Sequence, residues 1–187
     1  MQGHADAPLD DIGREQAHAL AARLQDEVFE AIYSSPLARA RETAEILAAA
    51  RRQPILFDQR LVERDLGQWT GLTGDEVNER FPDYLGHDWR REGPPGGESQ
   101  AALIARVDAA LGEIIAAYRE SAVAVVGHGG ALSAYIAHTL GAPVEKWVAF
   151  SFPNTGVARL DVRRDRLRVL SVGDDRHLDA IRISASP

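Results

Sequence analysis

The sequence predicts an α/β protein in which a mixed, mostly parallel sheet lies between layers of helices. Segments with apolar residues at helical spacing alternate along the chain with short apolar segments typical of strands. The run Ala122-Val123-Ala124-Val125-Val126 is typical of a strand that is covered on both faces. A length of 187 residues suits one hydrophobic core, so residues 1–187 are expected to form a single domain.

The first part of the chain is expected to contain two helices and two strands. Residues 10–29 have the spacing of a helix that Asp10 or Asp11 caps, and a strand follows at residues 29–33. Ser34-Ser35-Pro36 opens the second helix, with a serine as the cap, and residues 55–57 form the next strand. The apolar residues expected on the buried faces of these helices are Ala17, Leu20, Ala21, Leu24, Val28, Leu37, Ala40, Ala44 and Leu47.

Residues 59–98 are expected to form an excursion that lies over the domain. Glycines, prolines and charges interrupt the pattern there, with one short helix near residues 73–81. Long excursions are often lids or binding loops, so substrate choice is expected to be made in this segment. Trp69, Tyr84 and Trp89 either line a pocket or pack the lid onto the domain, and packing is the commoner role for a single aromatic residue.

The second part of the chain is expected to return to regular structure. A helix is expected over residues 99–119, and the apolar strand follows. A further helix over residues 131–140 ends at Gly141. Residues 156–162 and 167–172 alternate in polarity and predict a hairpin with residues 163–166 as its turn.

Composition argues against several classes of function. The net charge is −7 and no basic run is present, which argues against nucleic-acid binding and requires a local basic pocket for any anionic substrate. The apolar runs are too short to span a bilayer, and the first residues do not resemble a secretory signal, so a cytoplasmic location is the default expectation. The chain has no cysteines, which excludes disulfides and thiolate chemistry.

The first candidate for a reactive site is the turn Gly127-His128-Gly129-Gly130, where the apolar strand ends and a helix begins. Open α/β sheets bind ligands beyond the carboxyl ends of their strands, and N–H groups at a helix start can hold an anion. The alternative is a glycine-rich turn with an incidental histidine.

Two further segments carry polar residues that could belong to the same site. Arg39 and Arg41 follow the strand at residues 29–33, and their spacing allows only one of them to face the site. Both could instead be solvated surface residues. Glu63 precedes Trp69 and Gly71, where it could act as a general acid over the pocket or belong to a salt-bridged loop.

The sequence lacks several common motifs for nucleotide binding, nucleophilic catalysis and zinc binding. The sequence has no Walker-type loop, dinucleotide fingerprint, serine nucleophile elbow or paired-histidine zinc helix. Surface or packing roles are expected for the remaining histidines considered, which are His18, His87, His138 and His177.

Taken in order, these segments resemble the phosphoglycerate mutase-like branch, branch 1, of the histidine phosphatase superfamily. The resemblance covers nearly the whole chain and implies the three-layer α/β/α phosphoglycerate mutase-like fold. It is carried by Gln2-Gly3-His4 with Asp6, Pro8 and Leu9, Gly13 with Gln16-Ala17, Ser34 through Ala40 with Thr43-Ala44, Glu63 through Gly71, Gly96-Gly97-Glu98-Ser99, Val126-Gly127-His128-Gly129, and Asn154-Thr155-Gly156.

The resemblance implies a role for each candidate residue. Arg39 clamps the transferred phosphoryl group, Glu63 donates a proton to the leaving oxygen, and His128 stabilises the phosphoryl charge. These roles suit phosphoryl transfer, which needs positioned cations and donors around spreading negative charge. No metal and no cofactor are implied. The residues implied to bind phosphate or substrate are Gln2, Gly3, Gly129 and Asn154.

One part of the family pattern is not found in these 187 residues. Members of the family begin with a strand that ends in arginine-histidine-glycine. Its histidine is the nucleophile, its arginine also binds phosphate, and an asparagine follows in the next loop. By the resemblance, that missing first strand is central in the sheet, beside the strand at residues 122–126.

Two interpretations of this difference are open. In the first, Met1 is an internal methionine of a longer protein, because the start was misplaced or the chain was truncated. In the second, the chain is a naturally short, non-catalytic relative. The first is favoured because Arg39, Glu63 and His128 all stand in family-like contexts.

Either interpretation predicts that this chain by itself is inactive or nearly so, because covalent catalysis needs its nucleophile. Without a central strand, two strand edges stay unpaired. That predicts low stability, a homodimer, or another segment in the gap.

The activity that the resemblance implies is hydrolysis of a small phosphomonoester through a phosphohistidine intermediate. The excursion is short for a cofactor-dependent phosphoglycerate mutase. Gly96-Gly97-Glu98-Ser99 is commoner in the small phosphatases of the family, such as broad-specificity acid phosphatases and α-ribazole phosphatase. Two alternatives stay open, which are mutase-type phosphotransfer and a non-catalytic protein that binds a phosphorylated ligand.

Overall fold

The computed structural model describes residues 1–49, 51–84, 87–143, 150–163 and 166–184. Its strands form two sheets: a parallel sheet with the order β2-β1-β3 and an antiparallel hairpin of β4 and β5. Their bounds are β1 Ala31–Ser34, β2 Ile55–Phe57, β3 Val123–Val126, β4 Val157–Arg163 and β5 Arg166–Asp174. The mostly parallel α/β architecture predicted from the sequence is therefore confirmed.

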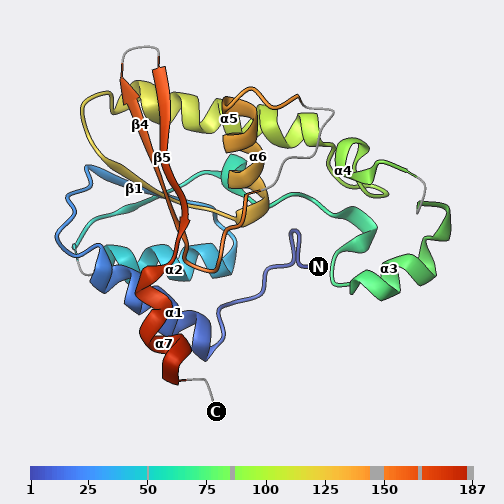
Figure 1. Cartoon of the computed structure of the whole chain (residues 1–187), viewed down its shortest axis with the longest axis horizontal. Helices are drawn as coiled ribbons and strands as arrows, with labels where there is room; N and C mark the ends of the chain where they lie inside the picture. Colours follow the sequence, from blue (N-terminus) through green and yellow to red (C-terminus); the bar gives the residue numbers. More distant parts are fainter. Residues whose placement is uncertain (50, 85–86, 144–149, 164–165, 185–187) are drawn as a thin grey trace.

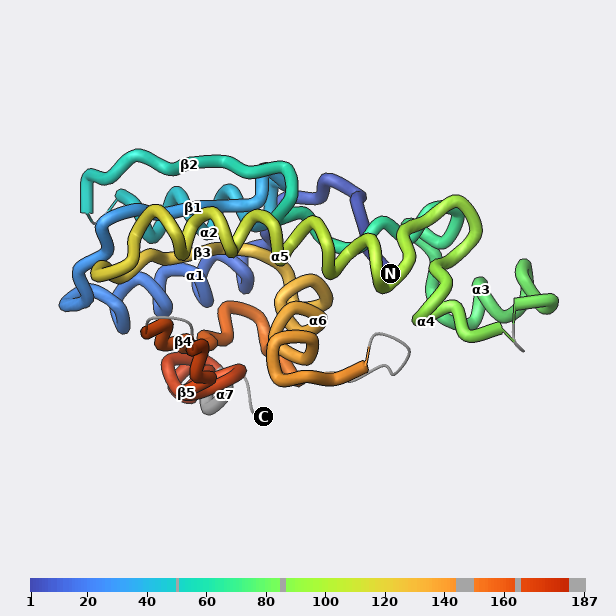
Figure 2. The backbone as a smooth tube through the Cα atoms, turned by 90° about the horizontal axis from the view of Figure 1, so that it is seen from above, coloured from blue at the N-terminus to red at the C-terminus, as the bar shows by residue number. Residues whose placement is uncertain are grey.

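Helices cover both faces of the parallel sheet (Figures 1 and 2). The helices α1 (Asp11–Arg23) and α2 (Ala38–Ala49) lie on one face, and α5 (Gln100–Ala117) lies on the other. Beyond β3, Figure 2 shows α6 (Gly129–Thr139), the hairpin and α7 (Asp179–Ser184). The parallel sheet thus forms the middle layer between α5 and the α1–α2 pair.

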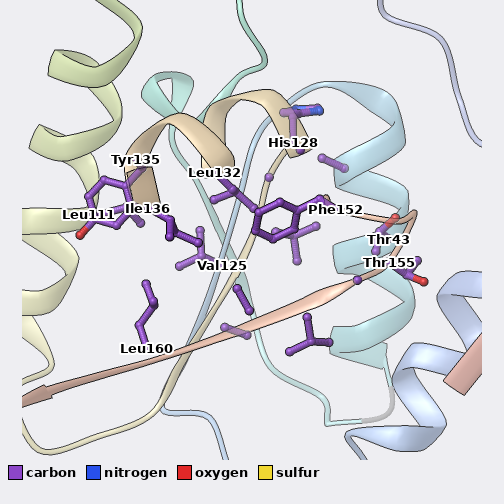
Figure 3. A pocket seen from close by; sticks show the side chains of 18 of the residues that line it. Thr43, Leu111, Val125, His128, Leu132, Tyr135, Ile136, Phe152, Thr155 and Leu160 are labelled. Atoms are coloured by element: carbon purple, nitrogen blue, oxygen red, sulfur yellow. The ribbon is translucent and has the colours of Figure 1, made fainter. Parts of the chain in front are cut away.

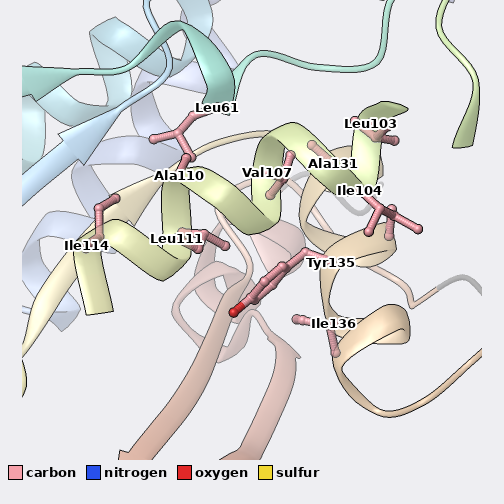
Figure 4. Close-up of a cluster of buried hydrophobic side chains, with 11 residues drawn as sticks. Leu61, Leu103, Ile104, Val107, Ala110, Leu111, Ile114, Ala131, Tyr135 and Ile136 are labelled. Atoms are coloured by element: carbon pink, nitrogen blue, oxygen red, sulfur yellow. The ribbon is translucent and has the colours of Figure 1, made fainter. Parts of the chain in front are cut away.

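Alternating side chains of the strands reach two separate cores, because successive residues of a strand point to opposite faces. On β3, Val123 and Val125 pack against the cluster of α5 and α6, whereas Ala124 and Val126 pack against the cluster of α1 and α2. Figure 4 shows the first cluster, in which the wholly buried Leu103 of α5 lies close to α6. A strand covered on both faces was predicted here, and the structure confirms it.

Residues 59–98 leave the sheet and return to it, and they carry α3 (Gly74–Arg80) and α4 (Trp89–Glu92) at one end of the molecule (Figure 1). We call this segment the lid. The Trp69 side chain is 2% exposed, and its ring packs edge-on against Trp89 and Tyr84, with centroids 5.1 and 5.9 Å away. Trp69 therefore packs the lid.

The two ends of the lid are hydrogen-bonded to each other. Gln68 N donates to Pro95 O at 3.0 Å, and Glu98 N donates to Asp65 O at 2.9 Å. Gly67 lies between these bonds with φ +49°, and a Cβ there would be 2.3 Å from Pro95 O. Only glycine fits this close approach of two backbones.

Three expectations from the sequence need correction. The first helix ends at Arg23 instead of continuing to residue 29, and Val28, expected in its buried face, is 85% exposed. The second helix begins at Ala38, and the side chain that accepts from Ala38 N belongs to Asp6, not to a neighbouring serine. The hairpin forms a sheet of its own, and residues 164–165 of its expected turn lie outside the described residues.

Candidate active site

A cavity of about 1590 Å³ lies between the two sheets (Figure 3). Among the described strands, β3 pairs only with β1 and β4 pairs only with β5, so each presents an unpaired edge. Val125 of β3, Leu160 of β4 and Leu111 of α5 line the cavity. Every residue from Ala122 to Gly130 also lines it, so the cavity follows β3 and continues past its carboxyl end.

His128 follows β3 and stands just before α6. Its side chain is buried, and its Nε2 is 2.8 Å from Ser35 Oγ. The pKa of His128 is lowered from 6.5 to about 3, mainly by burial and also by the nearby positive charges of Arg39 and Arg106. The imidazole is therefore neutral at pH 7.

Arg39 lies in the first turn of α2 and lines the same cavity. Its Nη1 donates to Ala5 O at 2.8 Å and its Nη2 to Gly3 O at 2.9 Å, which ties the N-terminal segment to α2. Arg41 is exposed, and its Nε is 3.8 Å from Glu45 Oε1 on the outer surface. Of the two arginines considered from the sequence, Arg39 is the one at the cavity.

Glu63 also lines the cavity, and its carboxylate lies against the start of α6. Oε1 accepts from Ala131 N at 3.0 Å and from Arg64 N at 2.8 Å, and Oε2 accepts from Gly130 N at 3.1 Å. The N–H groups at this helix start were predicted to be able to hold an anion. In the structure, two of them hold the carboxylate of Glu63.

The other residues predicted to bind phosphate or substrate also line the cavity, although they come from distant parts of the chain. They are Gln2, Gly3, Gly129 and Asn154. Trp89 of the lid and Arg64 line it as well. Arg64 is buried, and its Nε donates to Glu98 O while its Nη2 donates to Arg90 O.

Sequence reasoning missed three side chains near this site. Ser35 was expected to cap a helix; its Oγ accepts from Leu37 N at 3.3 Å just before α2, and it also contacts His128. His4 Nε2 is 2.7 Å from Glu63 O. Arg106 of α5 donates to Glu63 O at 2.9 Å. Arg106 and His4 each contact a backbone carbonyl far away in the chain, and no local sequence pattern signals such a contact.

The remaining histidines lie in other environments. His18, His87 and His138 are exposed. His177 is half-buried, and its two ring nitrogens lie 3.2 Å from Arg23 Nη1 and 2.9 Å from Thr155 Oγ1, so it links α1 to the turn before β4.

Within the described ranges, no three histidine, aspartate or glutamate side chains are grouped as a metal site. No helix in that part of the chain is both long and apolar enough to cross a membrane.

Comparison with known proteins places this geometry in a family. The family model described as histidine phosphatase superfamily (branch 1) matches residues 1–175. Phosphoserine phosphatase 1 of Hydrogenobacter thermophilus is 32% identical, over 98% of this chain and 89% of the relative. Glucosyl-3-phosphoglycerate phosphatase of Mycolicibacterium vanbaalenii is 38% identical, over 79% of this chain and 69% of the relative.

Solved structures show the same relationship at the level of the fold. The structure of Bacillus stearothermophilus YhfR matches with a TM-score of 0.88 at 33% identity, over 96% of this chain and 91% of that chain. The phosphoglycerate mutase-like α/β fold implied by the sequence resemblance is thus shown. By its family match, its curated relatives and its fold, the chain belongs to branch 1 of the histidine phosphatase superfamily.

Proposed function

We propose that the protein hydrolyses small phosphomonoesters, and that the phosphoryl group binds at the carboxyl end of β3. The observation that carries this proposal is the meeting of Arg39, Glu63 and His128 at one cavity, although three separate segments supply them. A cation, a carboxyl group and an imidazole are the groups that phosphoryl transfer to and from histidine requires.

Arg39 and His128 form the anion-binding side of the proposed site. Arg39 stays charged at every physiological pH, and its partial burial leaves that charge less screened than a surface charge. His128 has a pKa of about 3 and is neutral at pH 7, so it can donate one hydrogen bond. A phosphate dianion beside it would favour the protonated form, which donates two. Gly129 N–H is a third donor in this group.

Glu63, in its protonated form, is proposed as the proton donor to the leaving oxygen, and the transfer leaves it as the carboxylate. An alkoxide is a strong base and leaves slowly unless an acid protonates it as the bond to phosphorus breaks. Glu63 and Arg39 line the same cavity but come from different segments, so Glu63 can approach the ester oxygen while Arg39 holds the phosphoryl oxygens.

The nucleophile is proposed to come from an extended segment that occupies the cavity along β3. A volume of about 1590 Å³ exceeds the roughly 300–1,000 Å³ of most small-molecule pockets. The unpaired edges of β3 and β4 border it and offer a ladder of N–H and C=O groups to another strand. Gln16 also lines it, and its buried Oε1 has no hydrogen-bond partner among the described residues.

The substrate is proposed to be a small phosphorylated metabolite. The two curated relatives are named for phosphoserine and glucosyl-3-phosphoglycerate, which are both of this class. Gln2 and Asn154 line the cavity from opposite ends of the chain, and Trp89 lines it from the lid. These three side chains are the candidates for contact with the part of the substrate beyond the phosphate.

The test is to supply the proposed strand. Met1 lines the cavity, so a segment joined to Met1 that supplies a strand ending in arginine-histidine-glycine, followed by the asparagine-containing loop, is expected to enter it. We call the resulting protein the extended protein. We expect the 187-residue chain to release phosphate from p-nitrophenyl phosphate or phosphoserine only at background rates. The extended protein is expected to turn both over and to form an acid-labile phosphohistidine.

Other outcomes would change the assignment. High turnover by the 187-residue chain, abolished by His128→Ala, would show that no added nucleophile is needed. A folded extended protein that binds vanadate but releases no phosphate would favour a binding protein. Conversion of 3-phosphoglycerate to its 2-isomer, instead of phosphate release, would favour mutase-type phosphotransfer.

A further inference from the structure

The carboxylate of Glu63 accepts hydrogen bonds from backbone N–H groups, two of which belong to the start of α6. Three N–H groups, those of Arg64, Gly130 and Ala131, surround its two oxygens at 2.8 to 3.1 Å. The first N–H groups of a helix have no partner inside the helix. Gly130 and Ala131 belong to the first turn of α6, so Glu63 is their hydrogen-bond acceptor.

Gly130 makes room for this carboxylate. A Cβ at Gly130 would lie 2.6 Å from Glu63 Oε1, so the carboxylate would have to move away. Gly130 is helical, and alanine is generally more stable than glycine in a helix. The backbone of α6 thus gives no reason for a glycine here, whereas the approach of Glu63 does.

Arg106 holds the backbone of the Glu63 segment from the α5 side. Its Nη1 donates to Arg60 O and Val62 O, both at 2.8 Å, and its Nη2 donates to Glu63 O at 2.9 Å. Its Nε and Nη2 also bind both carboxylate oxygens of Glu98, at 2.7 and 2.8 Å. The pair is largely buried, with side chains 20% and 14% exposed. This two-point geometry needs the planar guanidinium, and lysine cannot reproduce it.

We propose that Gly130 and Arg106 are positioning residues for Glu63, and that they make the protein competent to cleave phosphomonoesters with poor, unactivated alcohol leaving groups. This inference rests on the proposed function, in which Glu63 is the proton donor. A nitrophenolate leaves without help, whereas an alkoxide needs a proton that is delivered at the right place. A misplaced acid therefore slows alkyl phosphates much more than nitrophenyl phosphates.

Amide hydrogen exchange in the 187-residue chain tests the positioning directly. The Ala131 amide is bonded to Glu63, whereas the neighbouring Leu132 amide is bonded within the helix to His128 O. We expect Gly130→Ala, Arg106→Lys and Glu63→Ala each to accelerate exchange at Ala131 about tenfold or more, with Leu132 unchanged. Gly74→Ala is the matched control, since Gly74 also begins a helix and a Cβ there would have nothing within 4 Å.

The thermal stability of Gly130→Ala separates positioning from general damage. We expect its Tm to stay close to that of the unchanged chain, because the helix preference of alanine offsets the loss of the Glu63 acceptor. Unchanged exchange at Ala131 in both Gly130→Ala and Arg106→Lys would overturn the proposal. So would acceleration at Leu132 of the same size, because it would indicate fraying of α6.

The extended protein supplies the functional comparison. The measured quantity is the ratio of kcat/KM for phosphoserine to kcat/KM for p-nitrophenyl phosphate. We expect Gly130→Ala and Arg106→Lys to lower this ratio about tenfold or more, as Glu63→Ala does, with Gly74→Ala unchanged. If Glu63→Ala leaves the ratio unchanged, the proton-donor role is wrong while the exchange result stands. If only Glu63→Ala lowers it, the positioning inference alone is wrong.

Discussion

His128 is a buried histidine whose surroundings favour the neutral form in the folded protein. Its pKa is about 3 in the fold and about 6.5 in the unfolded chain, mainly because burial disfavours the charged form. Below pH 6.5 the unfolded chain therefore binds a proton that the folded chain does not bind. The stability from this residue is complete above pH 6.5 and is lost as the pH falls towards 3.

This linkage can be measured by urea unfolding at several pH values. A shift of this size corresponds to at most on the order of 4 to 5 kcal/mol across the window. We expect the free energy of unfolding to fall as the pH is lowered from 6.5 to 4, and we expect His128→Asn to flatten that slope. An equal slope in the variant would show that other groups account for the acid sensitivity.

Arg39 and Arg41 form a natural pair for testing the anion site. Arg39 lines the cavity and Arg41 is exposed two positions away on the same helix. Hydrogen bonds to charged groups contribute about 1.5–3 kcal/mol, so we expect Arg39→Ala to weaken vanadate binding about tenfold to a hundredfold. Isothermal titration of the extended protein measures the affinity, and Arg41→Ala should bind like the unchanged protein. Equal weakening in both variants would point to a general charge effect.

Sequence reasoning reached part of this site and missed the rest for a physical reason. His128 and Arg39 follow strands, and the carboxyl ends of parallel strands lie along one edge of a sheet, so their meeting could be expected. Arg106 and His4 act on backbone carbonyls of the Glu63 segment. A carbonyl is present at every position, so the sequence carries no sign of which one a distant side chain will bind.

At the scale of elements, the start of α2 depends on a residue far away in the chain. Asp6 accepts from Ala38 N across 32 positions and so caps the helix that carries Arg39. Loss of a cap costs about 1 kcal/mol, within a range of roughly 0.5–2. We expect Asp6→Ala to lower the free energy of unfolding by that amount in urea titrations. Asp26→Ala, at an exposed position, should have no measurable effect.

The helices and strands were largely predictable from the sequence. One prediction failed where the helical spacing of apolar residues continues beyond the end of the helix. The apolar strand, the helices that flank it and the hairpin lie close to where the pattern placed them. Val28 continued the helical spacing of α1, but the helix ends at Arg23. Gln25 N bonds to Ala22 O and Glu27 N bonds to Leu24 O, three residues back instead of four, and the chain then turns towards β1. Local spacing cannot reveal a turn that tertiary packing imposes. Nor could local sequence show that the hairpin forms a separate sheet, because strand pairing is a long-range property.

For the whole molecule, the unpaired edges of β3 and β4 should govern its behaviour in solution. Exposed strand edges favour association with other chains, and unfilled space between packed layers weakens the fold. We expect the 187-residue chain to self-associate with rising concentration in sedimentation velocity experiments. The extended protein should have a single, concentration-independent species and a Tm higher by roughly 10 °C or more. A stable, monodisperse 187-residue monomer with a high Tm would contradict this view of the cavity.

The hydrogen bonds that join residues 65–68 to residues 95–98 affect how the substrate preference of such a protein can change during evolution. Gln68 bonds to Pro95 and Glu98 bonds to Asp65, so the two ends of the segment between them are held together whatever the sequence of that segment is. Lengthening a loop whose ends are fixed together adds little closure entropy, only about 0.6 kcal/mol for each doubling. The part of the lid between Gln68 and Pro95 can therefore be exchanged, by natural recombination or by grafting, while Glu63, which lies outside that part, keeps its place. Replacement of this segment could then change the substrate preference, while the residues that carry out the reaction stay the same.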